Sequence, residues 1–185
     1  MLDTLRRLMQ EVNAAPDLAQ VLAIITRRVK QAVGVEVCSI YLADPLHNQY
    51  VLMATDGLNL AAVGKVRGGA GEGLVSVVVE NSEPLNLDDA TDHPRYRYIA
   101  ETGEEKLHAF LGVPIIHQRK VLGVLVARQR ERRKFAENEE AFLVTVAAQL
   151  AGVIAHAEIS GDIQGLHDNA EPVARIDFAR HGGEG

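Results

Sequence analysis

The stretch FLGVPIIHQRKVLGVLVA, residues 110–127, consists of two apolar runs joined by a short polar link. The runs are residues 110–116 and 121–127, and the link HQRK occupies 117–120. Apolar runs of this length that flank a link of hairpin length are typical of paired, buried strands. We therefore expect an antiparallel hairpin in the centre of a β-sheet.

More strand-like segments precede this hairpin. Residues 37–42 and 50–55 are separated by Asp44-Pro45 and His47-Asn48, which favour turns, so a second antiparallel hairpin is expected there. A short strand at 63–66 and a brief edge strand at 83–87 complete the predicted sheet. Between these two segments, a Gly-rich stretch leads into a short helix over 74–79.

Helices are expected at both ends of this run of strands. Apolar residues recur at helical spacing over 2–12 and again from Leu18 to Val33, with Asp17 as N-cap and Gly34 as stop. The longest helix is expected from Glu137 to about His156. This order of elements predicts an α+β fold: a central antiparallel sheet with the N- and C-terminal helices on one face, and loops and a short helix on the other.

The length and composition indicate one domain. The chain has 185 residues, of which 47% are hydrophobic and 24% charged, within the size range of a single core. We expect the domain to cover 1–157. Residues 158–185, rich in Gly, Asp, Asn, Pro and His, are expected to be a linker or a disordered C-terminal tail.

The charge argues against nucleic-acid binding, because the formal net charge is −6 and phosphate neutralisation needs a basic surface. The basic run at 128–134 is expected to be solvated at a strand-to-helix junction. The N-terminus lacks the pattern of a secretory signal. The most apolar segment, 141–155, is shorter than the ~20 residues of a membrane span. We therefore expect a cytoplasmic protein without membrane contact.

Metal and cofactor sites are not expected. Cys38 is the single cysteine and lies inside an apolar run, where a buried, inert thiol is the ordinary outcome. The histidines of the middle region, His93, His108 and His117, lack the spacing of a metal site.

No catalytic machinery is expected either. Ser39 and Ser76 lack the sequence of a nucleophile elbow. The Gly-rich stretch at 68–73 fits neither the P-loop nor the dinucleotide fingerprint. We therefore expect that this chain is not an enzyme.

A binding site is expected between the sheet and the polar loop over 88–106, which has little apolar periodicity. The first N–H groups of the short helix, near Gly73 and Leu74, are a plausible anchor for a carboxylate or phosphate. The candidate ligand-binding residues come from the strands, this helix entry and the loop: Ser39, Tyr41, Thr55, Glu72, Gly73, Leu74, Asn86, Asp88, Tyr96 and Phe110.

A set of motifs, in order and spacing, resembles the GAF domain over about 1–157. The motifs are VCSIYLAD at 37–44, ATDGL at 54–58, GEGL at 71–74, FLGVPI at 110–115, VLGVL at 121–125 and FAENEEAFL at 135–143. The resemblance implies a sensory domain that binds a small ligand. The cyclic-nucleotide signature of some GAF domains is absent, and Cys38 does not suit a bilin link.

One branch of the family is similar over residues 1–12, 50–59, 93–96, 101–105 and 108–117: the N-terminal GAF domain of nitrogen-branch phosphoenolpyruvate-protein phosphotransferases. The resemblance implies a module that regulates the phosphotransfer domains of a parent chain, with glutamine or 2-oxoglutarate as candidate signals. The phosphorylated-histidine motif of such enzymes does not occur here, and His181 does not match it. A sensor without its catalytic domains is expected.

Three hypotheses remain open. In the first, a ligand alters terminal helices whose apolar stripes, at 2–12 and 142–154, pair two chains into a homodimer. In the second, the domain is a structural dimerisation module with a filled core and no ligand. The third, an enzyme resembling the GAF-fold methionine-sulfoxide reductases, would need several cysteines where this chain has Cys38 alone.

Overall fold

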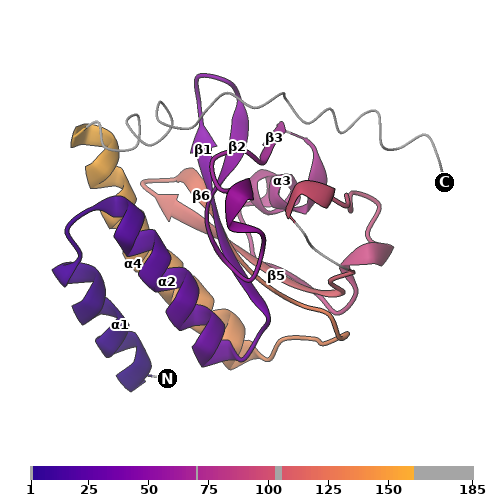
Figure 1. Ribbon diagram of the computed structural model, residues 1–185, viewed down its shortest axis with the longest axis horizontal. Helices are drawn as coiled ribbons and strands as arrows, with labels where there is room; N and C mark the ends of the chain where they lie inside the picture. The colour runs from indigo at the N-terminus through magenta and orange to yellow at the C-terminus, as the bar shows by residue number, and fades with distance from the viewer. Residues whose placement is uncertain (1, 70, 103–105, 161–185) are drawn as a thin grey trace.

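The computed structural model of the protein describes residues 2–69, 71–102 and 106–160 (Figure 1). It contains one antiparallel sheet of six strands in the order β3-β2-β1-β6-β5-β4. The strands are β1 Val37–Asp44, β2 Gln49–Asp56, β3 Arg67–Gly69, β4 Leu85–Leu87, β5 Ala109–His117 and β6 Lys120–Gln129. The helices are α1 Leu2–Ala14, α2 Leu18–Val33, α3 Gly73–Asn81 and α4 Glu137–Ser160. Short 3₁₀ turns are η1 Leu60–Ala62, η2 Ala90–Asp92 and η3 Ala100–Thr102.

The two expected hairpins are present and meet in the middle of the sheet through the β1–β6 pair. The turn between β5 and β6 consists of Gln118 and Arg119, whose φ angles are 49° and 67°. Two consecutive positive φ angles match the right-handed twist of a tight hairpin. The strand expected at 83–87 is confirmed as the short edge strand β4.

The prediction of a strand at 63–66 is wrong. The chain forms η1 just before it, where the Asn59 side chain accepts a hydrogen bond from Ala61 N at 3.1 Å. Gly64 N and Val66 O then bond to the backbone of Leu52, and the strand itself begins at Arg67. The apolar side chains that predicted a strand here belong to a turn that packs against Leu52 in the middle of β2.

The terminal helices α1, α2 and α4 form a layer on one face of the sheet, as expected, and the short helix α3 lies on the other face (Figure 1). α2 and α4 pack directly on the strands, whereas α1 packs on α2. Asp17 caps α2 by accepting from Gln20 N at 2.9 Å, and Gly34 ends it with a φ of 71°. These local signals are therefore confirmed.

Helix α4 is longer and more apolar than expected. The window Glu137–Glu158 has a mean hydropathy of 1.5 and satisfies the length and composition of a membrane span. The core helix of a soluble protein can have the same length and apolar composition. Here 44% of the window is buried, with Leu143, Val146 and Leu150 in the main core.

The apolar stripe expected to pair two chains lies against this chain's own sheet. Phe142, Val146, Leu150 and Ile154 are all buried in the main core, so the stripe is not available to a second chain. The surface that α4 presents to solvent includes Val144, which is 42% exposed. Of the tail expected from 158, residues 158–160 form the end of α4, and 161–185 lie outside the described residues.

Candidate functional site

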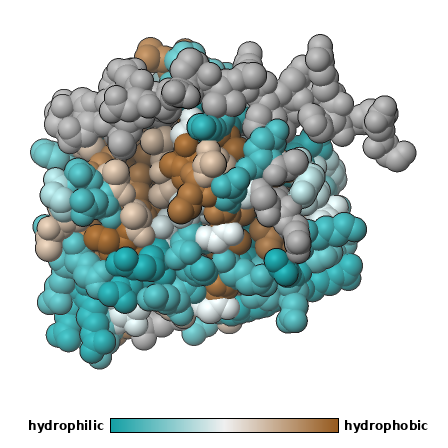
Figure 2. Space-filling view, viewed as in Figure 1, coloured by the Kyte–Doolittle hydropathy of each residue, from teal (hydrophilic) through white to brown (hydrophobic). Residues whose placement is uncertain are grey.

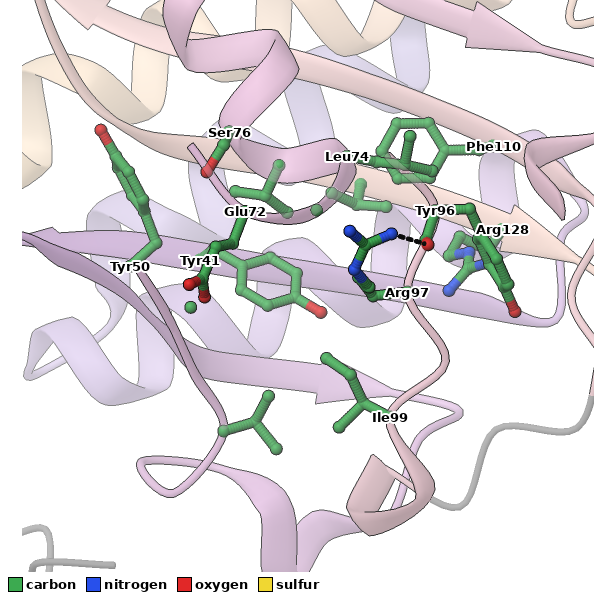
Figure 3. A pocket seen from close by; sticks show the side chains of 15 residues that line it. Tyr41, Tyr50, Glu72, Leu74, Ser76, Tyr96, Arg97, Ile99, Phe110 and Arg128 are labelled. Atoms are coloured by element: carbon green, nitrogen blue, oxygen red, sulfur yellow. Dashed lines mark hydrogen bonds between the residues drawn. The ribbon is translucent and has the colours of Figure 1, made fainter. Parts of the chain in front are cut away.

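A cavity of about 80 Å³ lies on the face of the sheet opposite α2 and α4 (Figure 3). A single water needs roughly 10–15 Å³ measured in this way, so there is room for a small organic molecule. The sheet forms its floor, the entry of α3 one wall, and the loop between β4 and β5 the opposite wall. In Figure 2, apolar side chains reach the surface near the middle of the view and are bordered by polar ones.

The floor carries a buried cation. Arg128, near the end of β6, is 9% exposed, and its guanidinium carbon lies 5.8 Å from the centroid of the Phe110 ring. Arg128 Nη2 donates to Leu107 O at 3.0 Å, which fixes the side chain. Tyr41 and Tyr50 stand on the same face of the sheet, on β1 and β2. The floor therefore combines aromatic rings with a fixed positive charge.

The loop supplies Tyr96, Arg97 and Ile99 to the cavity. Arg97 Nη1 donates to Tyr96 O at 2.8 Å, and Figure 3 shows its guanidinium directed into the cavity. The neighbouring Arg95 points elsewhere and pairs with Glu80 on α3, at 2.6 and 3.1 Å. The Arg95–Glu80 pair thus ties this part of the loop to α3.

The entry of α3 supplies Glu72, Gly73 and Leu74. Glu72 occupies the N-cap position, but its carboxylate makes no capping hydrogen bond. In Figure 3 this carboxylate lies toward Tyr50, whereas Arg97 and Arg128 lie toward Tyr96. The cavity is therefore negative at one end and positive at the other.

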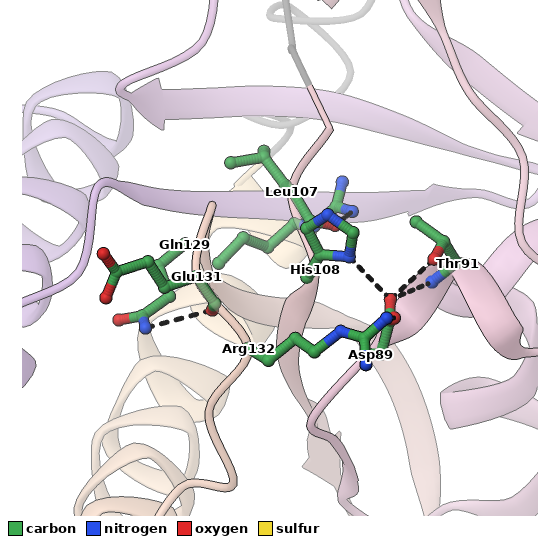
Figure 4. A network of polar contacts seen from close by, with 8 residues as sticks. Asp89, Thr91, Leu107, His108, Gln129, Glu131 and Arg132 are labelled. Carbon is green, nitrogen blue, oxygen red and sulfur yellow. Dashed lines mark hydrogen bonds and ion pairs between the residues drawn. The ribbon is translucent and has the colours of Figure 1, made fainter.

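A polar network beside the cavity holds both ends of the loop (Figure 4). Asp89 Oδ1 accepts from Thr91 N at 3.0 Å, from Thr91 Oγ1 at 2.6 Å and from His108 Nδ1 at 2.9 Å. Arg132 Nη2 lies 2.9 Å from Asp89 Oδ2 as an ion pair. The Thr91 and His108 hydrogen bonds lower the pKa of Asp89 to about 2. The carboxylate is thus ionised although its side chain is 4% exposed.

Residues 17–154 match the family model described as GAF domain. The chain belongs to the GAF domain family. The GAF domain of a phosphoenolpyruvate-protein phosphotransferase from Coxiella burnetii is 51% identical, with a TM-score of 0.84, over 87% of this chain and 96% of that one. The corresponding domain from Acinetobacter is 45% identical, with a TM-score of 0.80 and the same coverage.

A longer relative is the phosphoenolpyruvate-dependent phosphotransferase system protein of Salmonella typhimurium. It is 44% identical over 160 residues, which are 86% of this chain and 21% of the relative. The chain therefore spans about a fifth of the length of this curated relative. The resemblance to the GAF domains of such phosphotransferases, expected from the motifs, is confirmed at 44–51% identity.

The GAF fold brings six of the ten candidate residues together. Those that line the cavity are Tyr41, Glu72, Gly73, Leu74, Tyr96 and Phe110. They come from the strands β1 and β5, from the entry of α3 and from the loop, which are the three kinds of element that the sequence indicated.

The other four candidates lie outside the cavity lining. Ser39 and Thr55 are buried and hydrogen bonded to each other at 2.9 Å, across β1 and β2. Asn86 binds the backbone of Phe135, and Asp88 is exposed, with its carbonyl accepting from Arg133 N. The side chains of Ser39, Thr55 and Asn86 thus hold strands or the chain before α4, and Asp88 contributes only its backbone carbonyl.

The sequence did not indicate Tyr50, Ser76, Arg97 or Arg128, which also line the cavity. Arg128 ends the apolar run of β6, and it pairs across the sheet with Phe110 on β5. Strand alternation could have placed it on the same face as that ring. The basic residues that follow Arg128 in the sequence favour a solvated cation instead.

The rest of the basic run binds acidic or carbonyl groups of this GAF domain. Arg130 Nε lies 3.3 Å from Glu36, Arg133 pairs with Glu139, and Lys134 Nζ donates to the carbonyl of Asn86 at 3.1 Å. Together with the Arg132 pair, these contacts attach the segment between β6 and α4 to several other elements. Arg130, Arg132 and Lys134 are exposed to solvent, as expected, but they also form these contacts.

Cys38 lies fully buried on the helix-covered face of the sheet. Burial raises the pKa of its thiol far above the ordinary range, which disfavours the reactive thiolate. Among the residues that the structure describes, no three or more His, Cys, Asp or Glu side chains form a group that could hold a metal ion.

Proposed function

We propose that this GAF domain is the regulatory sensor of a phosphoenolpyruvate-protein phosphotransferase of the nitrogen branch. It binds a small metabolite in the cavity between the sheet, α3 and the loop, and thereby controls the phosphotransfer domains of a parent chain. The chain senses and does not catalyse, and its place is the cytoplasm. The observation that carries the proposal is a cavity with opposite charges at its two ends, in a domain 44–51% identical to GAF domains of such enzymes.

The charges favour a ligand with a carboxylate at one end. Arg97 and Arg128 offer guanidinium donors, which bind carboxylates more strongly than neutral donors do. Glutamine and 2-oxoglutarate, the candidate effectors, each carry such a group. Glu72 at the other end would accept a hydrogen bond from the side-chain amide of glutamine and would repel the second carboxylate of 2-oxoglutarate, so it favours glutamine.

A thermal-shift screen with glutamine, 2-oxoglutarate, other amino acids and nucleotides tests the proposal, followed by titration calorimetry. A ligand that binds only the folded state stabilises it by about 2.7 kcal/mol at a concentration of about 100 times its Kd. We expect glutamine to raise the melting temperature, and Arg97→Gln to weaken its binding about tenfold or more, as for a lost charged hydrogen bond.

Arg119→Gln is the matched control, because Arg119 is exposed in the β5–β6 turn, at the opposite end of β6 from Arg128. It should leave the affinity unchanged. If no compound in the screen stabilises the protein, the metabolite-sensor proposal is wrong.

A second candidate function, a dimerisation module without ligand, is favoured by the outer side of α4. A helix that is apolar all round is usually covered on all sides. In α4, Val144 is 42% exposed, and the exposed residues around it are uncharged: Ala141, Thr145, Ala148, Gln149 and Gly152. A second chain would cover this side, as would occur in a homodimer.

A further inference from the structure

We propose that the Asp89–Arg132 ion pair couples the cavity loop to the start of α4, so that a change in the loop alters the first turns of that helix. Neither residue lines the cavity. The inference deepens the proposed function, on which its ligand-dependent part rests. It assigns a route of regulation to two residues that act at a distance from the ligand.

The loop side of this route is anchored by Asp89. Its Oδ1 atom holds Thr91 at the beginning of the loop and His108 at the end, and Ala90 N also donates to His108 O. Tyr96 and Arg97, which reach the cavity, lie between these two anchors. A displacement of either end of the loop therefore acts first on the position of this one carboxylate.

The helix side is the segment 130–136, which joins β6 to α4. Arg132 in this segment contacts Asp89. The adjacent Arg133 pairs with Glu139 in the first turn of α4, and Ala136 N donates to Glu139 Oε1 at 3.0 Å. A movement of Arg132 is thus passed to the helix through its neighbours along a few residues of chain.

The two side chains of the ion pair differ in their exposure to solvent. The Asp89 side chain is 4% exposed, whereas that of Arg132 is 67% exposed. The buried carboxylate is held in place, and the exposed guanidinium can leave it for water, so the pair suits a contact that is made and broken. Two further contacts of the segment, from Phe135 to Asn86 and from Arg133 N to Asp88 O, reach residues that precede Asp89.

A double-mutant cycle read by hydrogen exchange tests the coupling without any ligand. Thr91→Val removes one hydroxyl donor to Asp89 on the loop side, and Arg132→Gln removes the ion pair on the helix side. We expect Thr91→Val to speed exchange of amides 137–142 about threefold or more, and to lose this effect in the Arg132→Gln background. If the effects of Thr91→Val and Arg132→Gln on the exchange rates of amides 137–142 are additive in the double variant, the proposal is wrong.

Lys134→Gln is the matched control, because Lys134 lies in the same segment, is exposed and donates to the carbonyl of Asn86 in β4. In this background Thr91→Val should still speed exchange at the start of α4. Loss of the effect here as well would show a general loosening of the segment and would contradict a specific role for Arg132.

A second hydrogen-exchange experiment uses glutamine as the ligand. In the wild-type chain, saturating glutamine should slow exchange at 137–142. Arg132→Gln should bind glutamine with unchanged Kd but lose the change in α4. An absence of glutamine binding would count against the proposed function, while the ligand-free cycle would still decide the coupling. If glutamine slows exchange at 137–142 in Arg132→Gln as much as in the wild type, the proposed coupling is wrong.

Discussion

Gly123 is required because two central strands approach closely at this point. On β6 it pairs with Leu42 of β1. A Cβ atom built at Gly123 would lie inside van der Waals contact of the Tyr41 carbonyl oxygen and 2.9 Å from Leu42 Cδ2. The backbone oxygen cannot move aside without disturbing the β1–β6 pairing, so a side chain at this position strains the sheet.

Gly123→Ala should therefore destabilise the fold by about 1–3 kcal/mol or more, the range for overpacking. Urea unfolding followed by circular dichroism measures the effect. Gly152→Ala is the control, because a Cβ at Gly152 in α4 meets no atom within 4 Å. This change should stabilise the helix by about 0.5–1 kcal/mol. Equal stability of the two variants would contradict the packing argument.

Asp89 makes the stability depend on pH in the acid range. Its pKa falls from the ordinary 3.8 to about 2 because Thr91 and His108 donate to the carboxylate. Since the folded-state pKa is the lower one, the ionised group stabilises the fold fully above pH 3.8. This contribution is lost as the pH falls toward 2.

Asp89→Asn should lower the stability at neutral pH, and the difference from wild type should shrink between pH 4 and 2. Urea midpoints at a series of pH values provide the measurement. The control, Asp88→Asn, changes an exposed neighbour and should have little effect at any pH. A constant difference between wild type and Asp89→Asn over this range would show that the carboxylate's charge is not what stabilises the fold.

The edge strand β4 and the approach to α4 are joined by one amide side chain. Asn86 Nδ2 donates to Phe135 O at 2.9 Å, and Phe135 N donates to Asn86 Oδ1 at 3.2 Å. The amide therefore satisfies a backbone donor and a backbone acceptor that precede the helix. Phe135 itself is buried in the main core, which keeps both partners in place.

Asn86→Ala leaves both backbone groups of Phe135 without this partner, so it should cost about 1–3 kcal/mol of stability. Since Asn86 does not line the cavity, the affinity for glutamine should not change. Asn138→Ala, at an exposed position of α4, should stay within about 0.5 kcal/mol of wild type. A loss of affinity in Asn86→Ala without loss of stability would restore its predicted role as a ligand contact.

The proposed binding cavity and the proposed dimer surface lie on opposite sides of one sheet. The cavity lies on the side of α3, and α4 covers the other side, with Val144 facing solvent. A signal from the cavity must therefore pass around or through the sheet to reach α4. The segment between β6 and α4 runs around one end of the sheet and contacts both sides.

If a second chain covers the outer side of α4, Val144→Glu should shift the protein from dimer to monomer. A buried, unpaired carboxylate in the interface is strongly unfavourable. Sedimentation velocity over a range of concentrations measures the change. Leu46→Glu, at a 74% exposed position in the β1–β2 turn, should leave the dimer intact. A monomeric wild type, or a dimer unaffected by Val144→Glu, would refute this interface.

Local chemistry was enough to predict most of the GAF fold. The apolar runs around 117–120, the Asp17 N-cap and Gly34 act on residues close in sequence, so their patterns could be recognised directly. The strand at 63–66 was predicted wrongly because hydrogen bonds with Leu52, across the sheet, determine that segment's form. The apolar stripe at 142–154 shows the same dependence on distant residues. Its periodicity indicates that one side of the helix is buried, but it does not indicate whether this chain's own sheet or a second chain buries that side.

The candidate site divides in the same way. Glycines at the entry of α3, and a polar loop before a buried hairpin, indicated where a ligand would bind, because turns and exposed loops have recognisable compositions. The choice of side chains required the fold. Asn86 could have faced a ligand or a neighbour, and Phe135, 49 residues away, takes its amide. Arg128 resembled the solvated cations after it until strand pairing placed it beside Phe110. The physical reason is that a polar side chain takes whichever partner the folded chain brings within reach, and that partner can lie anywhere in the sequence.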